Sequence, residues 1–154
     1  MCTVIKSISR SNTGDGISAG TECAITGSEA AMNDGSGIVM FSNCSVRDNR
    51  ATNQLAANSA GILVIGNGIH IVGNRSAHNY WGFFVSGEHN VIASNSCIVS
   101  PNAPIHAPTW FIAANNYHSG ISDYINITSP EVLAPDAGAT LNFPDPWVNL
   151  TYVD

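Results

Sequence analysis

Short apolar runs, separated by polar residues and glycine, recur along the first two thirds of the chain. They are three to five residues long and alternate in character, as at 61–65 and 69–72. Runs this short, interrupted by Gly and Asn, predict β-strands rather than helices. No helix-length segment separates successive runs, so the usual βαβ connection of a parallel sheet is not available. The pattern therefore predicts an all-β chain.

The predicted strands recur with a period of about 21 residues. Cys2, Cys23 and Cys44 are evenly spaced at this period, and each begins a similar phrase. Four further sets of positions follow the same period, which we call columns. They are an apolar column (Val4, Ile25, Val46, Ile71, Ile92), a Ser/Asn column (Ser7, Ser28, Asn49, Asn74, Asn95), a small-residue column (Ser9, Ala30, Ala51, Ser76, Cys97) and a glycine column (Gly16, Gly37, Gly61, Gly82). A partial column of Asn12, Asn33 and Asn79 lies between the last two. The glycine column is evenly spaced except between Gly37 and Gly61, which indicates three extra residues in one repeat, most simply within 53–58.

A chain that returns to the same register once in every such period forms a parallel solenoid. Each strand then pairs with its equivalent one turn further on, about 4.8 Å away, and like residues stack. We call one such turn a rung. Asn is expected at the corners because it tolerates the left-handed conformation and its amide can bond to a neighbouring rung. The column glycines are expected to supply positive φ at the other bend, and the small-residue column to face inward.

The phrases at 2–17 and 67–74, which include Asn-Thr-Gly-Asp-Gly-Ile and Asn-Gly-Ile-His-Ile-Val-Gly-Asn, resemble the parallel β-helix repeats of the pectate-lyase-like superfamily. The resemblance covers roughly residues 1–100. It implies a single-stranded, right-handed parallel β-helix with three sheets and about five rungs, followed at 101–154 by a last coil and a C-terminal capping tail. The superfamily includes polysaccharide lyases, hydrolases, epimerases and phage tailspikes, so the resemblance leaves the function open.

The two ends of the repeat region differ. Cys2 already lies in register with no cap before it, so the first rung is expected to be covered by another subunit or to continue a longer β-helix. No signal-peptide pattern opens the chain, which predicts a cytoplasmic protein as it stands, or an extracellular one if the chain is a piece of a longer secreted parent. All seven prolines lie in 101–154, and most aromatic residues lie between 80 and 152. These aromatics are expected to plug the C-terminal opening; the alternative is a sugar-stacking or subunit surface.

Composition narrows the possible partners. Only 10% of the residues are charged, with 11 acidic and 5 basic side chains and a net charge of −6. Without a basic surface, nucleic-acid binding is not expected. No apolar stretch approaches the length of a membrane-spanning helix. The low charge follows from corners that require Asn, Ser and Gly.

Catalytic residues are few and dispersed. Polysaccharide lyases use an Arg or Lys base, usually beside calcium-binding carboxylates, and glycoside hydrolases use two carboxylates about 5 to 9.5 Å apart. Arg50 and Arg75 share a column beside the Ser/Asn column, but no Asp cluster accompanies them. Asp15, Asp34 and Asp48 occupy different columns. The sequence therefore favours a non-catalytic protein without a cofactor.

The cysteines and histidines do not form a metal-binding pattern. Cys2, Cys23 and Cys44 share an inward column and are expected to be buried free thiols, with a disulfide along the column as the alternative; Cys97 lies elsewhere. No Cys-x-x-Cys or Cys-x-x-His spacing supports zinc, and the five histidines share no column. His70 is expected to face outward, and no metal site is predicted.

Three functional hypotheses follow. The first is a non-catalytic β-helix scaffold or recognition module that forms a homo-oligomer through its first rung or its C-terminal tail. The second is a protein that binds or degrades a carbohydrate along one face of the solenoid. The candidate ligand-binding residues are Arg50, Arg75, His78, Tyr80, Trp81 and Trp110. A third possibility is a piece of a trimeric, tailspike-like adhesin, which differs in predicting threefold assembly with the aromatic tail at the interface.

Overall fold

The computed structural model describes residues 1–87 and 89–98, and beyond them five strands at 105–107, 111–114, 117–119, 125–127 and 150–152. All regular structure in these residues is β, and they contain no helix. Three parallel sheets are formed. Sheet A consists of β1 (Cys2–Ile5), β4 (Cys23–Thr26), β7 (Ser45–Arg47), β10 (His70–Val72), β13 (Asn90–Ala93) and β16 (Phe111–Ala114).

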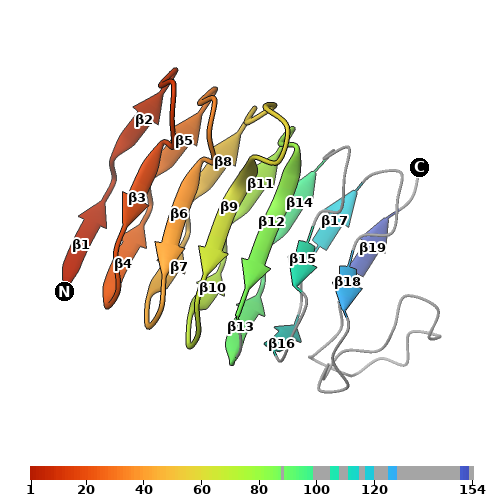
Figure 1. Ribbon diagram of the computed structural model, residues 1–154. Helices are drawn as coiled ribbons and strands as arrows, with labels where there is room; N and C mark the ends of the chain where they lie inside the picture. Colours follow the sequence, from red (N-terminus) through yellow and green to blue (C-terminus); the bar gives the residue numbers. More distant parts are fainter. Residues whose placement is uncertain are drawn as a thin grey trace.

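Sheet B consists of β2 (Ile8–Arg10), β5 (Glu29–Ala31), β8 (Arg50–Thr52), β11 (Arg75–Ala77), β14 (Ser96–Ile98), β17 (Tyr117–Ser119) and β19 (Leu150–Tyr152). Sheet C consists of β3 (Ile17–Ala19), β6 (Ile38–Phe41), β9 (Ala60–Ile65), β12 (Trp81–Ser86), β15 (Ile105–Ala107) and β18 (Ile125–Ile127). From β1 to β18 the chain passes through sheets A, B and C in turn, so equivalent strands of successive rungs lie side by side (Figure 1). The fold is a parallel β-solenoid of about five turns.

The strand register agrees with the predicted columns. Cys2 pairs with Cys23, and Val4 with Ile25, as the predicted period requires. In sheet C, Ile38 pairs with Ile62, a longer spacing that accommodates the three extra residues. The turn that takes them up lies at 56–58, inside the predicted segment.

The core is formed by the inward columns of all three sheets. Sheets A and C contribute branched and large side chains, of which Ile25, Ile62 and Phe83 are fully buried. Sheet B contributes the small-residue column, in which Ala30 and Ala51 are also fully buried. The alternation of inward and outward side chains along each short strand therefore produces one continuous core.

Polar ladders line the corners. At the corner between sheets A and B, the backbone N–H of each Ser/Asn-column residue donates to the side-chain oxygen of the next member, as from Asn49 to Asn74 (3.0 Å) and from Asn74 to Asn95 (2.9 Å). The Asn74 amide in turn donates to the carbonyl of Val46 (2.9 Å). Asn49, Asn74 and Asn95 are almost fully buried, so these bonds satisfy polar groups that water cannot reach.

The left-handed residues are not the ladder asparagines, as the sequence had suggested, but the residues just before them. Asp48 (φ 54°), Gly73 (φ 70°) and Ser94 (φ 55°) precede Asn49, Asn74 and Asn95. The other two corners have the same construction. Their left-handed residues are Ser11, Met32, Asn53 and His78 between sheets B and C, and Glu22, Asn43, Gly68 and His89 between sheets C and A.

The reason why glycine is required in the glycine column also differs from the predicted one, positive φ. Gly16, Gly37 and Gly61 do not have positive φ. A Cβ on Gly37 would lie 2.6 Å from the Gln54 amide nitrogen and 2.6 Å from the Gly61 carbonyl oxygen. Glycine is thus required because the backbone passes directly against the next rung and its polar ladder.

The predicted boundary near residue 100 and the aromatic C-terminal cap fall largely outside the described residues. The strands after residue 101 continue the sheets: β15, β16 and β17 pair in parallel with β12, β13 and β14. The division into a repeat region at 1–100 and a last coil with its cap at 101–154 stays a prediction.

Candidate functional site

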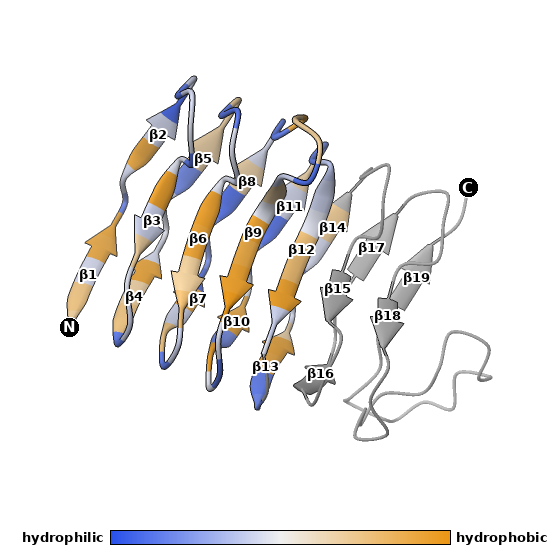
Figure 2. Cartoon of the chain, in the orientation of Figure 1, coloured by the Kyte–Doolittle hydropathy of each residue, from blue (hydrophilic) through white to orange (hydrophobic). Residues whose placement is uncertain are grey.

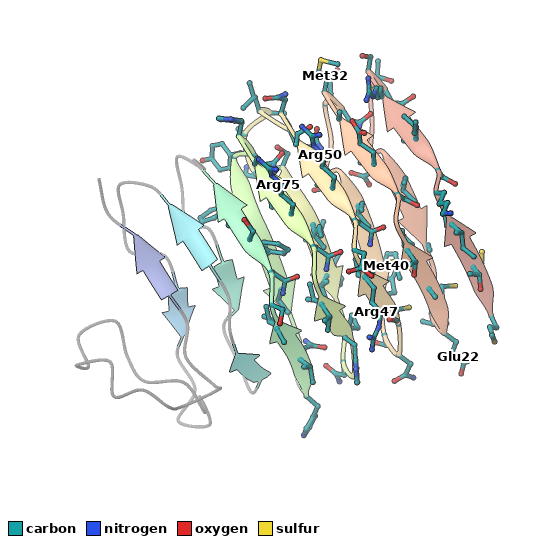
Figure 3. The ribbon with its side chains drawn as sticks, turned by 180° about the vertical axis from the view of Figure 1, so that it is seen from behind. Glu22, Met32, Met40, Arg47, Arg50 and Arg75 are labelled. Carbon is teal, nitrogen blue, oxygen red and sulfur yellow. The ribbon has the colours of Figure 1, made fainter. Side chains whose placement is uncertain are left out.

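Because the inward columns build the core, the outer faces of the sheets hold the candidate functional residues. The outward column of sheet A contains Thr3, Ala24, Ser45 and His70, in register on successive strands. His70 is exposed, as predicted. A shallow, open concavity extends over this column and is bordered by Glu22 and Arg47, which Figure 3 labels.

The charged groups at the rim of this concavity do not meet. The Arg47 side chain folds back and donates from Nε to Ser45 Oγ (2.9 Å). Glu22 lies at the C–A corner of the second rung, two rungs from His70. Two rungs correspond to about 9.6 Å along the axis, too far for direct proton transfer between these two side chains.

The outer face of sheet B carries an arginine pair. Arg50 and Arg75 occupy equivalent positions on β8 and β11 and are both exposed, as the shared column predicted (Figure 3). Glu29 precedes them in the same column but forms an ion pair with Arg10 instead. Within the described residues, no ion pair joins Arg50 or Arg75 to a carboxylate. Two adjacent guanidinium groups thus remain available to an anion.

The aromatic residues after the B–C corner form a separate group. The Tyr80 and Trp81 rings meet edge to face at a centroid distance of 5.6 Å. Trp81 also contacts Phe84 edge to face at 6.0 Å. Tyr80 and Trp81 were predicted from the sequence, but Phe84 was not, because it lies outside the continuous segment 78–81. Its outward position could have been found from the alternation with the inward Phe83 and Val85.

The structure divides the predicted ligand-binding set rather than assembling it into one site. Arg50 and Arg75 lie together on sheet B, while Tyr80 and Trp81 lie together at the start of sheet C. His78 occupies the corner between them, exposed and in the left-handed conformation (φ 55°). Trp110 lies outside the described residues.

The outer face of sheet C is largely apolar, which was not predicted from the sequence. Val39, Leu63 and Phe84 occupy one outward column on β6, β9 and β12, while Phe41 and Ile65 occupy a second. Phe41 and Ile65 are 37% and 44% exposed. In Figure 2 the strands β6 and β9, at the front of the solenoid, are coloured mainly as hydrophobic, inward and outward residues together. β3, β6, β9 and β12 contain no charged residue.

The thiols stack at the C–A corner. Cys23 and Cys44 are buried free thiols; the Cys23 backbone N–H donates to Cys44 Sγ (3.2 Å), and the Cys44 thiol donates to the Gly20 carbonyl (3.1 Å). Cys97 is also buried, whereas Cys2, expected to be buried, is exposed on the first rung. Among the described residues, no three His, Cys, Asp or Glu side chains lie close enough together to hold a metal ion.

Two of the carboxylates in the first two rungs, Asp15 and Glu29, have structural partners. Asp15 Oδ1 accepts a hydrogen bond from the Ser36 backbone N–H (2.7 Å), which ties two rungs together at the B–C corner. Glu29 pairs with Arg10 across sheet B. Neither carboxylate therefore stands free beside a second one, the arrangement that glycoside hydrolysis requires.

Comparison with known proteins returns no relative. No protein-family model matches the chain, and no significant match was found among curated proteins or among solved structures. No helix in the described part is long and apolar enough to cross a membrane. The parallel solenoid is therefore established by the structure alone, and function must be argued from its faces.

Proposed function

We propose that this chain is a non-catalytic β-solenoid scaffold that presents its outer faces for recognition and associates with further copies of itself. The observation that supports it most is the use of the corner side chains. The Ser/Asn ladder, Gln54 and Asp15 are all engaged in bonds between rungs, so they hold the fold instead of forming a reaction centre. What such a fold offers a partner is a set of regularly spaced outward rows.

The resemblance to the pectate-lyase-like superfamily supports this proposal at the level of architecture. Crossovers between parallel strands of one sheet are right-handed in nearly all proteins, which favours a right-handed winding here as well. Membership of the superfamily is part of the proposal, and so is self-association through the first rung or the C-terminal tail. β1, β2 and β3 are edge strands of their sheets, and an edge strand can accept a further strand.

Light scattering after size-exclusion chromatography tests the self-association. We expect a mass above that of one chain, 16.1 kDa, at high protein concentration. A mass of one chain at every concentration would contradict the proposal. Assays for the unsaturated products of polysaccharide lyases and for reducing sugars test the non-catalytic part, and turnover of any polysaccharide would contradict it.

A second function, binding of an acidic polysaccharide, is favoured by one specific observation. Arg50 and Arg75 lie one rung apart, about 4.8 Å, without a carboxylate partner among the described residues. Guanidinium groups bind carboxylates in a bidentate manner, and a polyuronate chain carries one carboxylate on every sugar. The Trp81 ring group lies past the next corner and would offer a stacking surface.

Titration calorimetry with uronate oligosaccharides at low salt tests this second function. We expect Arg50→Ala and Arg75→Ala each to weaken binding at least tenfold. The matched control is Arg47→Ala, which removes an exposed arginine from sheet A instead. Absence of binding across uronates and neutral glucans would exclude the second function and leave the scaffold.

A further inference from the structure

The three outer faces of the solenoid differ in charge. Sheet B carries Arg10, Glu29, Arg50 and Arg75, and sheet A carries Arg47 together with an exposed histidine. The four described strands of sheet C with side chains carry no charge at all. In a chain with a net charge of −6, sheet C is the face on which two copies can meet without opposing like charges.

The outward side chains of this face, which we call the C face, are mainly apolar and stacked in register. Leu63 pairs with Phe84, and Phe41 pairs with Ile65, whereas Val39, the partner of Leu63 on β6, is only 4% exposed and adds little to the surface. Trp81 contacts Phe84 at the same end. Contiguous apolar patches on a protein surface mark interaction sites more often than single exposed apolar residues do. The C face is such a patch.

We propose that the C face is the homodimer interface, with two solenoids packed C face to C face about a twofold axis. The inference rests on the proposed self-association and adds a third surface for it, besides the first rung and the C-terminal tail. Two sheets that pack face to face lie about 10 Å apart and cross at about 30°, so Phe41, Ile65 and Phe84 of each copy would interdigitate between them. The same patch serves both copies, as twofold symmetry requires.

The size of the C face predicts a weak dimer. Four rungs at about 4.8 Å and strands about five residues wide at about 3.3 Å give roughly 320 Å² per copy, or roughly 650 Å² for the pair. Stable interfaces bury about 1,200 Å² or more, so we expect a reversible dimer with a Kd on the order of micromolar.

Sedimentation velocity of the full chain over a range of micromolar concentrations tests this interface. We expect Ile65→Lys and Phe41→Lys to raise the Kd at least tenfold, since each places a cation in the centre of the C face. Both residues are exposed and point away from the core, so circular dichroism should show the same β spectrum. The matched control is Val91→Lys, which adds the same charge to the outer face of sheet A and should leave the Kd unchanged.

A charge-swap experiment makes the test specific for face-to-face packing. An Ile65→Glu chain and an Ile65→Lys chain should each be monomeric, and an equimolar mixture should recover the dimer. An oligomer that Ile65→Lys and Phe41→Lys leave unchanged would overturn the C face but not the proposed self-association. A wild-type chain that is monomeric at every concentration would overturn both.

Discussion

The A–B corner and the B–C corner are built in the same way but tolerate change differently. At both, a left-handed residue precedes an inward polar side chain that accepts a hydrogen bond from the rung before it, as Asn74 does from Asn49 and Gln54 does from Asn33. At the A–B corner, the next strand then begins at once. At the B–C corner, a link of variable length follows, at 13–15, 34–36, 55–60 and 80–81, before the glycine column closes the rung.

The difference indicates where this fold can take on function. The A–B corner has the same length in each described rung, because the next strand begins directly after the ladder residue. The hydrogen bonds of the B–C ladder are kept although the link that follows each ladder residue differs in length between rungs. The Tyr80–Trp81 pair lies in the shortest of these links. We therefore expect the A–B corner to contribute mainly to stability, whereas the B–C corner can hold residues that bind a partner.

Removing an A–B ladder side chain should have the largest effect. In Asn74→Ala, the Asn49 N–H and the Val46 carbonyl lose their partners while remaining buried. Buried unsatisfied groups cost about 1 to 3 kcal/mol each, so we expect a loss of about 3 kcal/mol in the free energy of unfolding. Urea denaturation measures this. Asn12→Ala, at an exposed B–C position on the first rung, is the control and should cost less than about 1 kcal/mol. Equal losses would show that burial of the ladder side chain does not determine its contribution to stability.

The glycine column tests how closely successive rungs approach. In Gly37→Ala, the new Cβ would lie 2.6 Å from the Gly61 carbonyl oxygen, a backbone atom that cannot move without shifting the next rung. Overpacking of this kind costs about 1 to 3 kcal/mol, so we expect about 2 kcal/mol in thermal or urea unfolding. Gly14→Ala, at the same corner but with no atom within 4 Å of the new Cβ, should be neutral or slightly stabilising. A neutral Gly37→Ala would show that the column is not kept by sterics.

Shortening the variable link should cost little. Deletion of 55–57 restores a three-residue link before Gly61, as in the first two rungs, and keeps Gln54 in its ladder. Only local bonds are lost, among them that from the Ser59 N–H to the Ala56 carbonyl (3.0 Å). Because loop-closure entropy changes slowly with length, we expect a change of less than about 1 kcal/mol in unfolding free energy. Insertion of three residues between Asp48 and Asn49, at the A–B corner, is the contrasting variant and should prevent cooperative unfolding.

The strand register could be predicted because the same residue type recurs at equivalent positions of successive rungs. Columns that repeat a residue type, such as Asn49, Asn74 and Asn95, gave the period, the strands and the shared column of Arg50 and Arg75. The place of Gln54 in the B–C ladder was not predicted, because the other members of its column are Asn and because it lies beside the three extra residues. Only its spacing of 21 residues from Asn33 indicated that it belongs to this column.

Other features were not predictable because several residue types meet the same physical demand. The left-handed position before each ladder residue holds Lys6, Gly27, Asp48, Gly73 and Ser94 in successive rungs. A column of this kind cannot be found by looking for one residue type that repeats. The C face was not predicted for the same reason, since Val39, Leu63 and Phe84 share only their apolar character and their outward direction. The outer faces, where a partner would bind, are the part of a solenoid that its repeat constrains least.

The left-handed position of the B–C corner offers the smallest and most specific test. Met32 adopts φ 55° and is 51% exposed, projecting from the corner in Figure 3. Asn53 holds the equivalent position on the next rung with φ 61°. Left-handed backbone costs most residues about 1 to 2 kcal/mol and Asn less, so Met32→Asn should stabilise the fold by about 0.5 kcal/mol, measured as an increase in the urea midpoint. Met32→Gln separates this backbone preference from the change in polarity and should give no gain. A gain for Gln as large as that for Asn would mean that exposure of the Met32 side chain, not its backbone conformation, limits stability at this corner.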